Sequence, residues 1–84
     1  MLTKNEMVQL IESFDSWTKI NNVIKDLTEG YGITNPMYSK IDIIGDIIKS
    51  NSKYYGSDDA SSYAYFDIMY NDCLTPEEKY NLLK

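Results

Sequence analysis

Side chains that commonly carry catalysis or bind metal ions are scarce in this chain. Its 84 residues include no histidine and a single cysteine, Cys73. Histidine is the most frequent general base and metal ligand, and without it a zinc site would need carboxylates plus one thiol. Asp72 precedes Cys73, and a neighbouring negative charge disfavours the reactive thiolate. We therefore expect no enzymatic activity, no cofactor and no metal site.

Carboxylates occur in two adjacent pairs, Asp58–Asp59 and Glu77–Glu78. Both pairs stand where a helix is expected to begin, and acidic side chains there are stabilised by the positive end of the helix dipole. The first pair also lacks the alternating oxygen ligands and the central glycine of a calcium loop. The two pairs are thus better explained by helix starts than by acid–base catalysis or cation binding.

The spacing of apolar residues predicts an all-α fold, a compact bundle of three main helices plus a short C-terminal helix, in one domain over residues 1–84. The helices are expected over residues 4–29, 36–49, 61–72 and 76–84. Short connections between them favour antiparallel neighbours.

Local signals mark the helix boundaries. Capping boxes, in which a threonine and a glutamate three residues later cap each other's backbone N–H groups, are expected at Thr3–Glu6 and Thr75–Glu78. Asn35 before Pro36 starts the second helix, and Gly30 ends the first. The third helix takes its N-cap from the Asp58–Asp59 pair.

Apolar residues at steps of three and four predict the core. In the first helix they are Met7, Leu10, Ile11, Phe14, Trp17, Ile20, Ile24 and Leu27. In the second they are Met37, Ile41, Ile44 and Ile48, widened by Tyr38, Ile43 and Ile47. The short fourth helix has Tyr80, Leu82 and Leu83 to pack. Gly45, inside the second stripe, either allows a close helix–helix approach or marks a mild break.

The third helix, SSYAYFDIMYND, carries apolar side chains on two faces. One face has Tyr63, Phe66 and Tyr70; the other has Tyr65, Ile68 and Met69. A bundle this small buries one such face easily and both with difficulty, so one of them is a candidate contact for a partner or a second subunit. Asp67, between the faces, is expected at the solvent edge or hydrogen-bonded to a tyrosine hydroxyl.

Charge is distributed unevenly along the chain. The net charge is −5, and residues 54–78 hold six acids and no lysine. Direct nucleic-acid binding is not expected, because the chain is acidic and has no arginine. Tyrosines mixed with carboxylates instead favour contact with a basic surface of another protein. The partner-binding residues that we expect are Asp58, Asp59, Tyr63, Tyr65, Asp67, Ile68, Met69 and Asp72.

Hydropathy predicts no membrane contact, since no apolar run is long enough to span a bilayer, and with the single cysteine it favours the cytosol. In its size, acidity, tyrosine-rich third helix and lack of catalytic residues, the chain resembles small helical proteins of phages and mobile elements that inhibit host machinery, anti-CRISPR proteins among them. The resemblance implies a non-enzymatic inhibitor that binds and blocks a larger host protein in the host cytosol.

Two other functions remain open. One is a homo-oligomeric structural or immunity-type bundle, in which a homodimer or higher oligomer buries the third helix. The chain resembles helical bacteriocin immunity proteins in being a small helical bundle. A small-ligand binder that sequesters a nucleotide-like signal is the other alternative, with lysines and helix N-termini as the groups for a phosphate.

Overall fold

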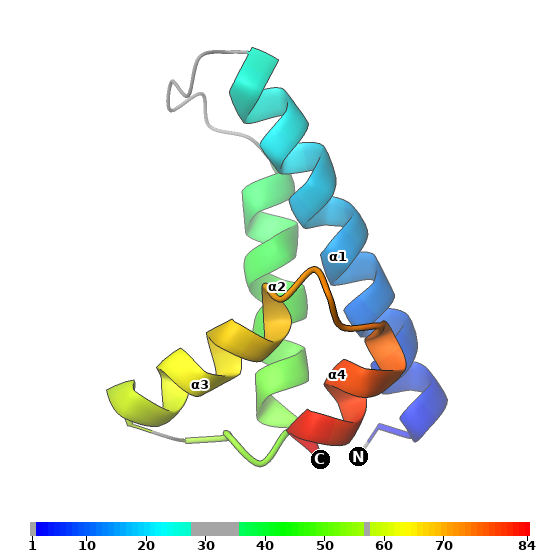
Figure 1. The fold of residues 1–84 in the computed structure, drawn as a ribbon, viewed down its shortest axis with the longest axis vertical. Helices are drawn as coiled ribbons and strands as arrows, with labels where there is room; N and C mark the ends of the chain where they lie inside the picture. Colours follow the sequence, from blue (N-terminus) through cyan, green and yellow to red (C-terminus); the bar gives the residue numbers. More distant parts are fainter. Residues whose placement is uncertain (1, 28–35, 57) are drawn as a thin grey trace.

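The structure is a computed structural model that describes residues 2–27, 36–56 and 58–84, with side chains for all of these except 21–27, 36–39 and 59. Within these ranges every regular element is a helix: α1 (Lys4–Leu27), α2 (Pro36–Ser50), α3 (Asp59–Met69) and α4 (Pro76–Leu83) (Figure 1). The predicted all-α fold, with a short last helix, is confirmed for this part of the chain.

The two long helices form the frame of the molecule. Figure 1 shows α2 running back alongside α1 in the opposite direction, with both chain ends at the same end of this pair. The short helix α4 packs against α1 and α3, and the start of α3 extends away from the other helices. The antiparallel packing expected from short connections is thus present in the α1–α2 pair.

Helix starts follow the predicted capping signals. In the Thr3–Glu6 box the Thr3 N–H donates to Glu6 Oε1 at 3.0 Å, and the Glu6 N–H donates to Thr3 Oγ1 at 3.2 Å. The Thr75–Glu78 box has the same two bonds, at 3.1 and 3.2 Å. Asp58 is the N-cap of α3. Pro36 opens α2 as expected, whereas the predicted Asn35 cap and Gly30 stop lie outside the described residues.

The core draws on all four helices. Its buried apolar side chains are Met7, Ile11, Phe14, Ile41, Ile48, Tyr65, Met69 and Leu83. Other predicted core residues are exposed, namely Ile20, Ile43, Ile47 and Leu82. The sequence therefore predicted too wide a buried face on these helices, because no described helix covers the side that carries these four residues. The side chains of Ile24, Leu27, Met37 and Tyr38 lie outside the description.

Gly45 is a point of close approach, not a break, because α2 continues through it. The Tyr65 hydroxyl of α3 donates a hydrogen bond to the Gly45 carbonyl at 2.7 Å. The Phe14 ring of α1 lies nearby, and a Cβ added at Gly45 would stand 3.5 Å from Phe14 Cε2 and 4.0 Å from the Tyr65 hydroxyl oxygen. Burial, followed by the nearby Asp46 carboxylate, raises the pKa of Tyr65, so that its hydroxyl remains a donor.

Candidate interaction surface

The outer side of α3 presents three large aromatic side chains to solvent. Tyr63 is 72% exposed, Phe66 47% and Tyr70 56%. Their spacing of three and four residues places them on one side of the helix, and Asp67 is exposed between them. We call these four residues the aromatic face of α3.

The inner side of α3 belongs to the core, which corrects part of the predicted partner surface. Tyr65 and Met69 are buried, and Ile68 is half-buried against the same cluster. The Tyr65 hydroxyl is held by Gly45 of α2, so this helix face turns inward. Tyr65, Ile68 and Met69 are therefore packing residues, and the exposed apolar side of α3 is the one with Phe66 and Tyr70.

Ring contacts tie the aromatic face to the core beneath it. The Tyr70 ring lies edge-on to the buried Phe14 ring, with centroids 5.4 Å apart. Phe66 is 6.2 Å from Tyr70 and 5.5 Å from the buried Tyr65, centroid to centroid. Such edge and tilted arrangements are the favoured geometries of aromatic pairs. Phe66 and Tyr70 are thus held in place while about half of each side chain stays available.

Carboxylates are spread along α3 and just beyond it. Asp58 caps the start of the helix and accepts a hydrogen bond from the Ser61 N–H at 3.0 Å, which lowers the pKa of Asp58. Asp67 is exposed in the middle and Asp72 just after the end. The Asp59 backbone opens α3, but its side chain lies outside the description. Negative charge therefore accompanies the aromatic face along its length.

Lys49, near the end of α2, contacts α3 beside the buried Tyr65 and not at the aromatic face. Lys49 Nζ donates to Ser62 Oγ at 2.9 Å and lies 5.8 Å from the centroid of the buried Tyr65 ring. Because α3 itself contains no lysine, this contact leaves the aromatic face acidic.

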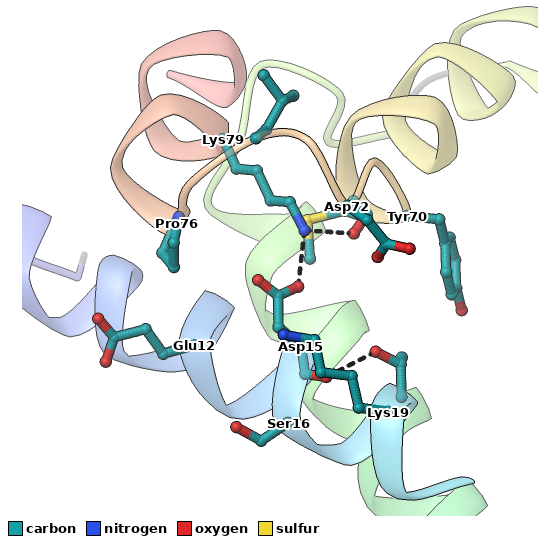
Figure 2. A pocket seen from close by; sticks show the side chains of 11 residues that line it. Glu12, Asp15, Ser16, Lys19, Tyr70, Asp72, Pro76 and Lys79 are labelled. Carbon is teal, nitrogen blue, oxygen red and sulfur yellow. Dashed lines mark hydrogen bonds and ion pairs between the residues drawn. The ribbon is translucent and has the colours of Figure 1, made fainter. Parts of the chain in front are cut away.

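A groove of about 520 Å³ lies beside the end of α3 (Figure 2). Its lining residues are Glu12, Asp15, Ser16, Thr18, Lys19, Met69, Tyr70, Asp72, Leu74, Pro76 and Lys79. Figure 2 shows Lys79 reaching from α4 toward Asp15 of α1. The Lys79 Nζ donates to Asp15 Oδ1 at 2.7 Å and to the Met69 carbonyl at 2.8 Å. This lysine is already paired, so it is a poor anchor for a phosphate or carboxylate ligand.

Sequence reasoning missed Lys79, which is only 2% exposed. Lysine is almost never fully buried, so the residue type itself argued against this position. One signal was present: Lys79 stands four residues before Leu83, and residues four apart share a helix face. Its partner Asp15 lies 64 positions away, and no local pattern links the two.

Among the residues that the structure describes, no three cysteine or carboxylate side chains come together to hold a metal ion. Cys73 is exposed and not in a disulfide. No described helix has the length and apolar content needed to cross a bilayer. Comparisons with protein-family models, with curated proteins and with solved structures find no match for this chain.

Proposed function

We propose that the protein is a non-enzymatic binding protein that docks the aromatic face of α3 on a basic surface of a larger protein and blocks it. The observation that carries the proposal is the exposure of Tyr63, Phe66 and Tyr70 in the most acidic part of the chain. In line with its resemblance to phage-encoded inhibitors, we assign it to the inhibition of a host protein.

Aromatic side chains are suited to the centre of such an interface. Tyrosine and tryptophan are enriched among residues whose truncation costs the most binding energy. Phe66 and Tyr70 are already held by their contacts with Tyr65 and Phe14. Less side-chain freedom is therefore lost on binding than for three unsupported rings.

The carboxylates determine what kind of surface is bound. Asp58, Asp67 and Asp72 attract lysine and arginine, and a partner cation that reaches the Tyr63 ring gains a cation–π contact as well. Two copies of this face would repel each other. Binding to a basic partner is thus favoured over self-association through α3.

The proposal is tested by capturing a partner from the native host with the full chain, identifying it by mass spectrometry and titrating the purified pair. The double variant Tyr63→Ala/Phe66→Ala is expected to raise the Kd at least about 100-fold, since we place both rings among the few hot-spot residues, each of which contributes at least about 2 kcal/mol. Affinity of the native chain is expected to fall as salt is added.

The control variant is Leu82→Ala, which removes an exposed apolar side chain of α4 and is expected to leave the Kd unchanged. Far-UV circular dichroism checks that each variant keeps its helices. A captured protein that binds the double variant and the native chain equally well would disprove a role for the aromatic face.

A further inference from the structure

A second apolar surface lies on the α1–α2 pair, away from α3 and α4. We call it the rear face. Its exposed apolar residues are Ile20, Ile43 and Ile47, and beside them Leu2, Leu10, Trp17 and Ile44 are half-buried against the core. Ile43 is 59% exposed and Ile47 39%, although both carry only carbon and hydrogen beyond the backbone. An apolar surface of this kind on a small protein typically marks a contact with another molecule.

Two contacts show that these residues of α1 and α2 share one side. The Lys40 Nζ of α2 lies 5.1 Å from the centroid of the Trp17 ring of α1. At the other end, the Leu2 N–H donates to Asn51 Oδ1 at 3.4 Å. The isoleucines lie between Lys40 and Asn51 at steps of three and four residues, so they follow the same row of the helix.

The other two helices attach elsewhere. Tyr65 of α3 contacts α2 at Gly45, and α4 contacts α1 through the pair of Lys79 and Asp15. Neither attachment point lies in the row that holds Ile43 and Ile47. Within the described part of the chain, the rear face therefore has no covering element.

Charge distinguishes the rear face from the rest of the molecule. Lys40 lies over Trp17, Glu6 lines a shallow groove with Leu10, and Glu12 lies at the edge that the rear face shares with the groove of Figure 2. These three side chains sum to −1, and Asp46, exposed at the border of the face three residues after Ile43, brings the sum to −2. A second copy of this chain, itself at −5, is repelled far less here than at α3.

We propose that the rear face is the interface of a homodimer in which the α1–α2 pairs of two copies stack face to face as a four-helix bundle. We infer a second copy as the partner because the face is apolar, is less acidic than α3, and carries its lysine and Glu6 at opposite ends. Glu6 lies near the start of α1, and Lys40 lies at Trp17, eleven residues further along. A two-fold axis that lies in the plane of the interface and runs across the helices exchanges the two ends of the face, and so brings Lys40 of each copy toward Glu6 of the other.

This dimer is independent of the function proposed above, and the two are compatible. Because α3 lies on the opposite side of the α1–α2 pair, both aromatic faces stay open in the dimer. A target with two basic sites would then be bound by both copies at once, and the effective concentration of the second site strengthens such binding.

The mass of the full native chain in solution tests the proposal, measured by sedimentation velocity from about 1 to about 200 µM, a range that covers Kd values typical of modest dimers. The expected result is a shift to twice the mass of the chain. Ile47→Asp is expected to raise the dimer Kd at least about tenfold, because it buries a carboxylate in the interface. Phe66→Asp, at similar exposure on α3, is the matched control and is expected to leave the Kd unchanged.

Three outcomes overturn the proposal: a native chain that stays monomeric throughout, an Ile47→Asp variant that dimerises as before, or a dimer lost in Phe66→Asp instead. If Ile47→Asp loses its helical circular dichroism, Lys40→Glu replaces it. Lys40 is exposed, so this variant is expected to fold. It places two carboxylates together across the interface, and an unchanged Kd for it would equally overturn the proposal.

Discussion

Lys79 is the residue on which three helices converge. Its ammonium group, carried by α4, donates to a carboxylate of α1 and to the last carbonyl of α3. A buried charge costs several kcal/mol in lost hydration and is tolerated only when its partners are in place. The Lys79–Asp15 pair therefore specifies one position of α4, because any shift of this helix leaves a buried charge without its partner.

We predict that Lys79→Ala lowers the free energy of unfolding by about 3–5 kcal/mol, the usual cost of removing one member of a buried ion pair. Asp15 would keep a largely buried carboxylate, and the Met69 carbonyl would lose its donor. The measurement is urea unfolding followed by circular dichroism.

Lys4→Ala is the control, because Lys4 and Glu77 form an exposed pair at 3.6 Å. Such surface pairs contribute less than about 1 kcal/mol. Equal stability of the two variants would show that the buried pair contributes no more than the exposed one.

At the residue scale, the sequence identifies the apolar side chains of α3 but does not predict which of them are buried. The sequence shows that α3 is apolar on two sides, and helical period alone separates Tyr63 from Tyr65. Which of the two turns inward depends on the Gly45 carbonyl of another helix. That contact joins residues 20 positions apart, and nothing in the local spacing encodes it.

At the element scale, prediction succeeds where the signal is local. Both capping boxes form as expected because their hydrogen bonds join residues only three positions apart. The extent of the buried stripe on α2 is not a local property. Ile41 and Ile48 are covered while Ile43 and Ile47 are exposed, and the packing partners of α2 decide between them.

Gly45 gives a prediction about α2. Its backbone does not need a positive φ, and an added Cβ meets Phe14 Cε2 at 3.5 Å and the Tyr65 hydroxyl oxygen at 4.0 Å, both ordinary contacts. Alanine also restricts the unfolded chain more than glycine does. We expect Gly45→Ala to raise the free energy of unfolding by about 0.5–1 kcal/mol in a urea titration.

Gly56 is the matched control, since its φ of +66° is a conformation that side chains disfavour. Gly56→Ala is expected to lower the free energy of unfolding by about 1 kcal/mol. If Gly45→Ala is destabilising instead, the Phe14 ring has no room to adjust, and the approach at Gly45 is tighter than ordinary van der Waals contact.

At the scale of the whole molecule, one small core joins the four helices, and among the described residues no helix covers the aromatic face or the rear face. α3 and α4 occupy one side of the α1–α2 pair, so the aromatic face points outward there and the rear face lies opposite. The sequence predicts the helices and an acidic, tyrosine-rich region, but not this division into two sides. Apolar residues that pack within a chain and those that meet a second copy follow the same spacing, so Ile43 and Ile47 were predicted to be core.

Because the core is continuous, a substitution that removes core packing in α4 is expected to destabilise α1 as well. Leu83, at the end of α4, is fully buried, and its carbonyl accepts a hydrogen bond from the Lys53 N–H at 2.8 Å. Trp17 lies on α1 and packs partly against the same core cluster. We predict that Leu83→Ala lowers the free energy of unfolding by about 2–5 kcal/mol, measured at one protein concentration. The loss should be equal by Trp17 fluorescence and by circular dichroism, as in two-state unfolding.

The neighbouring Leu82→Ala variant is the control, since Leu82 is exposed and its truncation should cost less than about 0.5 kcal/mol. A different result would be informative about the rear face. If Leu83→Ala shifted the circular dichroism transition while Trp17 fluorescence kept its native midpoint, the α1–α2 pair would be stable without α4. A two-helix pair has too little core to fold alone, so that stability would have to come from outside the single chain, and the prediction of one cooperative unit would be wrong.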